Sequence, residues 1–154
     1  MTSISGIDAR ILLSLQRNAS RSMADLADEI GSSPTTCWRR VRAMEEEGIL
    51  GATVRQVDHR KVNCGLDVFC QVRMRAHDRA SRETFQHMLE AVPHIIAAYA
   101  TSGDCDYLLH CLVGSIDEYQ KILTDSILAC SAVASSATLF ALSRVKHTNI
   151  VPIG

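Results

Sequence analysis

The chain has 154 residues, and 47% of them are apolar, which is enough for one hydrophobic core or two small ones. Its 16 Lys and Arg residues nearly balance its 17 Asp and Glu residues, so the formal net charge is −1. This balance excludes a protein that binds nucleic acid through bulk positive charge, so any DNA affinity must come from local placement of basic groups.

Neither a targeting segment nor a disulfide framework is expected. Met1 to Gly6 lacks the basic start and apolar run of a signal peptide, and no apolar stretch has the length of a membrane span. The six cysteines form no C-x-x-C pair and lie singly in apolar sequence. We therefore expect a reduced protein in the prokaryotic cytosol.

Three helices are predicted in the first 50 residues. The first ends at about Arg17, and its apolar residues recur with helical spacing at Ile4, Ile7, Ile11, Leu12 and Leu15. Ser22 and Asp25 form a capping-box pattern at the start of the second helix, which Gly31 ends. Ser33 is placed to cap a third helix with Pro34 at its first position. The short turn between the last two helices predicts a helix-turn-helix corner.

The third helix has two different faces. Cys37, Val41 and Met44 fall within a narrow arc that should contact the other helices, whereas the far side carries arginines and Trp38. Guanidinium groups suit phosphate oxygens and guanine edges, although the same pattern also fits a solvated basic helix face. The acidic run before Gly48 should point away from DNA. The candidate DNA-binding residues are Ser33, Thr35, Thr36, Trp38, Arg39, Arg40 and Arg42.

A bridging segment follows. Alternating apolar and polar residues from Gly51 to Val57 predict one extended strand, and Asp58 to Gly65 is predicted to be a hinge with a helical turn at His59 to Val62. The expected domains are thus 1–50 for DNA binding, 51–65 for the bridging strand and hinge, and 66–154 for effector binding and oligomerisation.

The remaining residues predict a β-α-β-β-α-β order. The expected elements are strands at Val68–Met74, Ile95–Thr101, Tyr107–Val113 and Thr138–Val145, with helices at Ser81–Ala91 and from Gly114 to about Cys130. This order indicates an α+β chain with a C-terminal ferredoxin-like domain. Because Tyr107 to Val113 is apolar on both faces, a second copy of the sheet should cover the side without helices, which predicts a homodimer.

The order of these parts resembles the Lrp/AsnC, or leucine-responsive and feast/famine, transcriptional regulators. The resemblance covers essentially the whole chain. The stretches that carry it are Trp38-Arg39-Arg40-Val41, Glu45-Glu46-Glu47-Gly48-Ile49-Leu50, Ser102-Gly103-Asp104-Cys105-Asp106-Tyr107-Leu108-Leu109 and Val145-Lys146-His147-Thr148.

The resemblance implies a DNA-reading domain joined to an amino-acid-sensing domain, with dimers that often assemble into octamers, or tetramers of dimers. It also implies that a free amino acid binds between subunits near Gly103 to Asp106. The chain departs from the family at Cys105, where a bulky aromatic residue is usual. The candidate effector-binding residues are Thr101, Gly103, Asp104, Cys105 and Asp106.

The turn has two interpretations from its residues alone. Gly103 allows backbone N–H groups to approach a carboxylate, and Asp104 can pair with an ammonium group, so both ends of an amino acid could be held. Gly and Asp are also the commonest residues of a plain hairpin. Cys105 is either a small apolar filler or an oxidant-sensing thiol.

A sequence-specific transcriptional regulator that responds to an amino-acid-type effector is therefore expected. Two alternatives are an architectural DNA-coating protein without an effector and a small dimeric enzyme that uses the Gly103 to Asp106 turn and His110. The histidines are scattered without metal-ligand spacing, and no catalytic triad or phosphate loop occurs. We expect no catalytic residues, no metal and no cofactor, and we expect association with the nucleoid.

Overall fold

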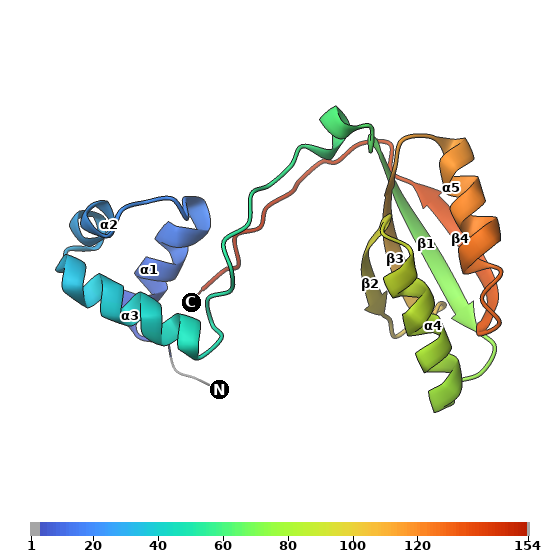
Figure 1. Ribbon diagram of the computed structural model, residues 1–154, viewed down its shortest axis with the longest axis horizontal. Coiled ribbons are helices and arrows are strands. Elements are labelled where there is room, and N and C mark those ends of the chain that lie inside the picture. Colours follow the sequence, from blue (N-terminus) through green and yellow to red (C-terminus); the bar gives the residue numbers. More distant parts are fainter. Residues whose placement is uncertain (1–3, 154) are drawn as a thin grey trace. The chain divides into compact units, whose positions relative to one another are not determined.

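The computed structural model describes residues 4–153, which form two compact units (Figure 1). The first unit comprises Met1–Gln56 with Val145–Gly154, and the second comprises Val57–Arg144. Residues 145–153, which we assigned to the second domain from the sequence, thus belong to the first unit. Gln16 accepts a hydrogen bond from the backbone N–H of Val151 at 2.5 Å, and Ile153 packs against the helical core.

Three helices form the first unit, and their bounds agree with the sequence predictions. They are α1 (Gly6–Arg17), α2 (Met23–Ile30) and α3 (Pro34–Glu46). Each begins with a serine cap, and the Ser22 hydroxyl both accepts from the backbone N–H of Asp25 and donates to its carboxylate. The core that joins the helices consists of Ile11, Leu12, Leu26, Ala27, Ile30, Cys37 and Met44.

A partly buried polar link also joins α1 to α2. Ser14 is 1% exposed, and its hydroxyl donates to the Glu29 carboxylate at 2.7 Å. Arg21 forms an ion pair with the same carboxylate. The Ser14 hydrogen bond and the Arg21 charge hold the pKa of Glu29 below its usual value.

Residues 51–58 form no strand in the single chain, so the predicted bridging strand is wrong for this segment. A strand needs a partner for its backbone groups, and the alternating pattern of one segment does not supply one. The predicted helical turn is confirmed as a 3₁₀ helix, η1 (His59–Val62).

The second unit has the predicted β-α-β-β-α-β order. Its elements are β1 (Leu66–Met74), α4 (Arg79–Ala91), β2 (Ile95–Ala100), β3 (Tyr107–Val113), α5 (Ile116–Ile122), a π-helical turn η2 (Leu123–Ile127) and β4 (Val133–Phe140). The strands form one sheet in the order β2-β3-β1-β4, with every neighbouring pair antiparallel. This confirms the ferredoxin-like arrangement.

The last strand lies earlier in the chain than we predicted. We expected Thr138–Val145, whereas β4 runs from Val133 to Phe140. Its Ala-Ser-Ser-Ala stretch has weak strand propensity, and pairing with β1 overrides that preference. β4 ends at Phe140, which pairs with Val68 near the start of β1.

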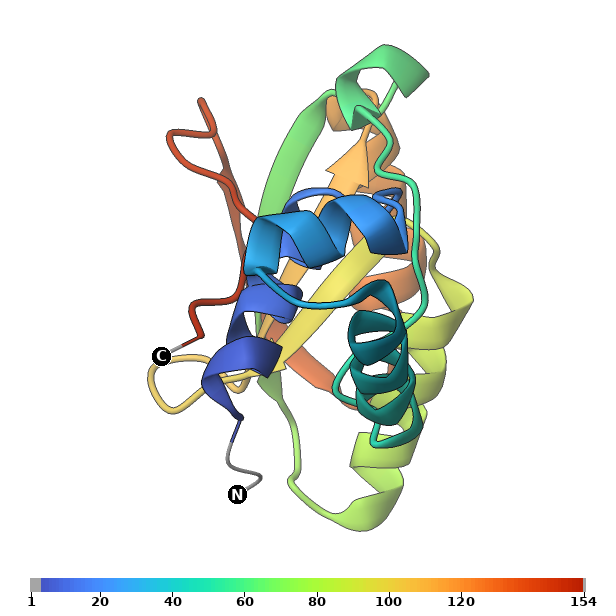
Figure 2. The same cartoon turned by 90° about the vertical axis from the view of Figure 1, so that its left-hand side faces the viewer.

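Helices α4 and α5 cover the same face of the sheet (Figure 1), and the view turned by 90° keeps both helices on one side of the strands (Figure 2). The core on that face includes Val68, Cys70 and Val72 of β1, with Phe85 of α4 and Tyr119 of α5. No helix of the described part of this unit covers the other face. None of the helices within residues 4–153 is long and apolar enough to cross a membrane.

Candidate functional site

The local sequence fixes the start and the orientation of α3. Gly31 adopts a left-handed conformation, with φ 66° and ψ 50°, and turns the chain out of α2. The Ser33 hydroxyl then accepts from the backbone N–H of Thr36 at 3.2 Å, and Pro34 occupies the first turn. Cys37 and Met44 are buried against the other helices, as predicted.

The outward face of α3 exposes Trp38, Arg39 and Arg42. Trp38 is 56% exposed, and the guanidinium carbon of Arg42 lies 5.8 Å from the centre of its ring system. Arg42 also forms an exposed ion pair with Glu45 at 3.2 Å. Thr35 is exposed at the start of the helix, and Thr36 bonds to the Ser33 hydroxyl. These groups can meet both the phosphates and the base edges of DNA.

Arg40 lies apart from this face. Its guanidinium group donates to Asp8 at 2.8 Å and to the Ser5 hydroxyl at 3.3 Å, and so joins α3 to the start of α1. Burial alone would raise the pKa of Asp8, but the hydrogen bonds from Ser5 and Arg40 lower it. The structure therefore leaves Arg39 and Arg42 exposed but places Arg40 within the helical unit.

In the second unit, the turn between β2 and β3 is closed by its own residues. The Thr101 backbone N–H donates to the Asp106 carbonyl at 2.9 Å, and the Thr101 hydroxyl donates to the Cys105 carbonyl. Gly103 and Asp104 are exposed, and a Cβ atom added at Gly103 would meet no atom within 4 Å. Open space therefore remains beside the part of the turn that we expect to contact an effector.

Asp106 has a structural partner. Its carboxylate accepts from the backbone N–H of Met74 at 2.7 Å, and its own N–H donates to the Val72 carbonyl at 2.9 Å. These bonds attach the turn to the end of β1. Of the candidate effector residues, Asp104 thus keeps its carboxylate at the surface, whereas the Asp106 carboxylate is engaged.

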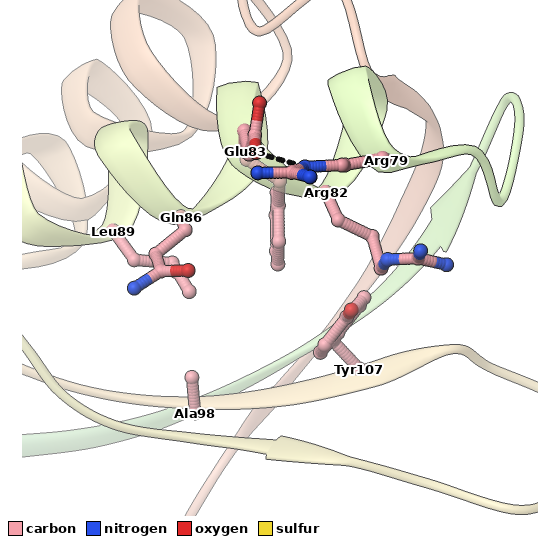
Figure 3. Close-up of a pocket in the computed structure, with 8 residues that line it drawn as sticks. Arg79, Arg82, Glu83, Gln86, Leu89, Ala98 and Tyr107 are labelled. Carbon is pink, nitrogen blue, oxygen red and sulfur yellow. Dashed lines mark hydrogen bonds and ion pairs between the residues drawn. The ribbon is translucent and has the colours of Figure 1, made fainter.

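A cavity of about 380 Å³ beside the turn was not predicted from the sequence. Arg79, Arg82 and Glu83 project from α4, and Ala98 and Tyr107 face them from β2 and β3 (Figure 3). Arg79 pairs with Glu83 at 2.7 Å, and Arg82 donates to the His77 carbonyl. The cavity depends on the docking of α4 against the sheet, which sequence periodicity does not specify.

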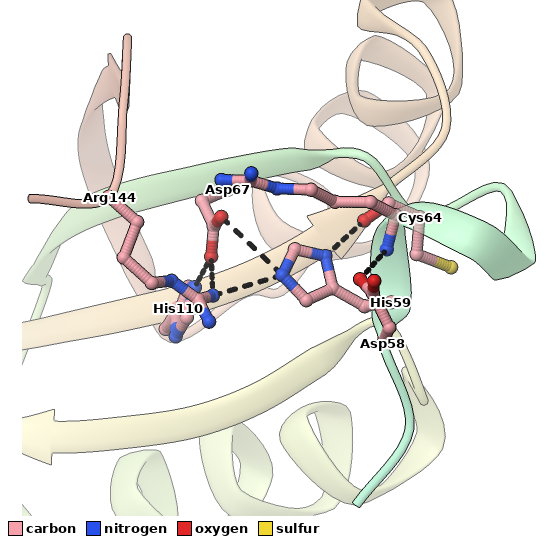
Figure 4. Close-up of polar contacts among 7 residues, drawn as sticks. Asp58, His59, Cys64, Asp67, His110 and Arg144 are labelled. Carbon is pink, nitrogen blue, oxygen red and sulfur yellow. Dashed lines mark hydrogen bonds and ion pairs between the residues drawn. The ribbon is translucent and has the colours of Figure 1, made fainter. Parts of the chain in front are cut away.

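A cluster around Asp67 was also missed, because we began β1 at Val68. Asp67 is 9% exposed, and its carboxylate accepts from His110 and from Arg144, each at 2.8 Å (Figure 4). His110 also stacks on Phe69, so both its Nε2 atom and its ring face have partners within the sheet. The available signal was one charged residue at the start of an apolar strand.

The described residues hold no group of three His, Cys, Asp or Glu side chains that could bind a metal ion. The buried thiols are poor nucleophiles. Burial, and to a lesser extent the neighbouring Cys70, raise the pKa of Cys111 to about 12. Burial also raises the pKa of Cys70.

Comparisons with known proteins agree with both units. Residues 67–151 match the family described as the Lrp/AsnC ligand binding domain, and residues 4–50 match a winged helix-turn-helix DNA-binding family. The glutamate uptake regulatory protein of Zymomonas mobilis is 33% identical over 146 residues, which cover 95% of this chain and 88% of that protein. The DNA-binding transcriptional activator DecR of Escherichia coli is 30% identical over 96% of this chain and 97% of its own.

Solved structures share the whole fold. An AsnC family transcriptional regulator from Agrobacterium tumefaciens superposes with a TM-score of 0.91 at 32% identity over 96% of each chain. A transcriptional regulator from Neisseria meningitidis in complex with L-Met superposes with a TM-score of 0.93 at 27% identity over 97% of each chain. The helix-turn-helix unit, the ferredoxin-like unit and these matches together show that the chain belongs to the Lrp/AsnC family of transcriptional regulators.

Proposed function

We propose that this protein is a sequence-specific DNA-binding transcriptional regulator whose DNA binding or assembly responds to a small effector of the amino-acid type. The observation that carries the proposal is the exposed face of α3, which carries Trp38, Arg39 and Arg42 behind a helix-turn-helix corner. The same chain carries a ligand-binding domain of the Lrp/AsnC family. The relatives are named as regulators, which favours regulation over catalysis.

DNA contact is assigned to the face of α3. Arg39 and Arg42 would supply phosphate or guanine contacts, Thr35 would approach bases at the helix start, and Trp38 would cover the sugar backbone. Arg40 would act indirectly by holding α3 against α1 through Asp8.

Effector binding is assigned to the turn after β2. Backbone N–H groups near Gly103 would hold a carboxylate, and Asp104 would pair with an ammonium group. The relative from Neisseria meningitidis was solved with L-Met, which supports an amino acid as the class of ligand. Cys105 is smaller than an aromatic residue, so the pocket would admit a bulkier ligand or hold a small one more weakly.

Self-association is assigned to the face of the sheet that lacks helices. By strand register, Phe69, Leu108, Leu112, Tyr99 and Leu139 share that face, and Tyr99 and Leu139 are 60% and 53% exposed in the single chain. Water contact with so much apolar surface is unfavourable, so a second copy of the chain would cover it. Such dimers could assemble further into a tetramer of dimers, acting in the prokaryotic cytosol at the nucleoid.

The proposal is tested by selecting genomic DNA fragments with the purified protein and measuring their affinity with each free amino acid. We expect a limited set of fragments with a shared sequence, and one amino acid that changes the affinity or the stoichiometry. Equal capture of all fragments would contradict sequence-specific regulation. Specific capture that no amino acid alters would contradict the effector part alone.

A further inference from the structure

Two chain segments connect the second unit to the first. Both of them begin, in the second unit, beside the buried carboxylate of Asp67. Val57 and Arg144 are the terminal residues of the second unit. Arg144 donates to Asp67 at 2.8 Å, and His59, two residues after Val57, lies 3.8 Å from the same carboxylate. Figure 4 shows Asp67 between His59 on one side and His110 with Arg144 on the other.

The hydrogen bonds define the proton on His59. Its Nδ1 lies 2.6 Å from the Cys64 carbonyl oxygen, which can only accept, so Nδ1 carries the hydrogen. Its Nε2 lies 3.1 Å from an Arg144 guanidinium nitrogen, which can only donate. His59 is therefore neutral in this arrangement, and its Nε2 lone pair accepts from Arg144.

The two histidines of the cluster respond differently to acid. His110 donates from Nε2 to the Asp67 carboxylate, and it can keep this bond in both its neutral and its charged form. A second proton on His59, in contrast, would place an N–H and a positive charge against the Arg144 guanidinium group. Protonated His59 would then draw Oδ2 of Asp67, which lies 3.8 Å from its Nε2, toward itself and away from Arg144, which bonds to Oδ1.

Asp67 is the main acidic group that could pair with a positive charge on His59. Within its own turn, Asp58 caps the backbone N–H of Arg60 and lies 4.0 Å from the exposed Lys61 ammonium. The other charged or titratable groups facing it include Asp67 of β1, His110 of β3 and Arg144 after β4. Asp67 is therefore the buried acceptor for which the cations compete.

We propose that Asp67 is a positioning residue that holds both connecting segments to the second unit, and that protonation of His59 releases Arg144 from this cluster. At neutral pH both segments begin from fixed points. In acid the segment that begins at Arg144 gains freedom, which changes how the helix-turn-helix units of an assembly can be spaced. This step rests on the proposed DNA-binding function.

The first experiment tests the cluster without DNA. Two-bond ¹H–¹⁵N NMR correlations report the tautomer of each histidine, and His59→Gln identifies the His59 signals. At pH 8 we expect His59 in the neutral form with hydrogen on Nδ1. Hydrogen on Nε2 at pH 8 would overturn the proposed cluster, whatever the protein does with DNA.

The second experiment measures the affinity for a selected DNA fragment from pH 8 to pH 5.5 at constant salt. We expect wild-type affinity to fall by about fivefold or more between pH 8 and pH 5.5, as typical for coupled sites. General protonation of histidines would instead strengthen binding to DNA, so the expected sign is distinctive.

Three variants locate the effect. His59→Gln keeps an acceptor for Arg144 but does not titrate, so its affinity should be high and flat with pH. Arg144→Gln should have the low affinity of acid wild type at both pH values. His94→Gln is the control, because His94 is not part of the cluster and its Nε2 lies 3.3 Å from the Glu118 carboxylate. This variant should behave as wild type.

A pH response that persists in His59→Gln would overturn the proposed switch. A flat wild-type profile with clear DNA binding would overturn it as well. Absence of specific DNA binding at every pH would instead contradict the proposed function, while the NMR tautomer would still decide the structure of the cluster.

Discussion

Arg40 and Arg42 are two positions apart in α3, yet their guanidinium groups have different partners. Arg40 pairs with Asp8 and is half-buried, whereas Arg42 lies beside Trp38 at the surface. An ion pair between two helices restricts how they pack against each other. An exposed arginine can instead replace its bound water with a phosphate group. Arg40 therefore stabilises the helical unit, while Arg42 stays available for the proposed contact with DNA.

Replacing both Arg39 and Arg42 with alanine should weaken DNA binding without loss of folding. Each lost phosphate contact should reduce the slope of log affinity against log salt by about 0.9, and each lost base contact should cost roughly 1–3 kcal/mol. Fluorescence anisotropy over a salt series measures both effects. The matched control is Arg75→Ala with Arg79→Ala in the second unit; a wild-type salt series in the α3 variant would contradict the assignment.

Replacing Asp67 with asparagine should destabilise the second unit by about 1.5–3 kcal/mol at pH 7, the usual contribution of hydrogen bonds to a charged group. Burial alone would raise the pKa of Asp67, but the hydrogen bonds from Arg144 and His110 and the charge of Arg144 lower it. A carboxylate with a lowered pKa stabilises the fold above its unfolded pKa, about 3.9, and loses this effect as the pH falls through the folded pKa.

The difference between wild type and Asp67→Asn in urea unfolding should thus persist from pH 7 to about pH 5 and shrink below about pH 4. Asp104→Asn is the control, since Asp104 is exposed, and it should unfold as wild type. A difference that disappears already at pH 6 would point to the histidines rather than to Asp67.

At the scale of elements, the corner between α2 and α3 depends on one backbone conformation. Gly31 has a φ of 66°, and a Cβ atom there costs about 1–2 kcal/mol although no neighbouring atom obstructs it. Gly31→Ala should therefore lower the unfolding temperature of the first unit. The fluorescence of Trp38, the only tryptophan, reports this unfolding. Gly6→Ala, at a position without positive φ, should be neutral or slightly stabilising; equal behaviour of both variants would contradict the argument.

The sheet face without helices provides a second test at this scale. Leu139→Asp places a charge on that face, so it should dissociate a dimer that buries the face while leaving each chain folded. Light scattering gives the mass, and circular dichroism reports the fold. The control is Ile116→Asp at the start of α5, where Ile116 is 59% exposed on the helix side. A compact wild-type monomer at micromolar concentration would exclude the proposed dimer.

At the scale of the whole molecule, the turn after β2 should couple effector binding to DNA binding, with a coupling free energy of about 1–3 kcal/mol. A thermal-shift screen identifies the amino acid, because a ligand that binds only the folded state raises its stability. Calorimetry should then show that Asp104→Ala abolishes binding of that amino acid and leaves unliganded DNA affinity near wild type. Cys105→Tyr should change which amino acid is preferred.

The control for this experiment is Asp117→Ala, which removes a carboxylate from the exposed start of α5 and should bind the effector as wild type. Undiminished binding in Asp104→Ala would place the effector elsewhere. The cavity lined by Arg79, Arg82 and Tyr107 is then the next site for mutagenesis.

The sequence by itself determined the features that depend on neighbouring residues. Ser22, Gly31, Ser33 and Pro34 predicted the helix boundaries because caps and left-handed glycines act within one turn of chain. Helical and strand periodicity likewise predicted the burial of Cys37 and Met44 and the order of the ferredoxin-like elements.

Only the tertiary structure decided which partners distant residues find. The Ala-Ser-rich β4 forms because β1 supplies its hydrogen bonds, and the segment 51–58 forms no strand because the single chain offers it none. Arg40 meets Asp8 across 32 positions, and Asp67 meets His110 and Arg144 across 43 and 77 positions. No local pattern encodes such pairs, since their free energy arises only after folding brings charges together in a partly desolvated site.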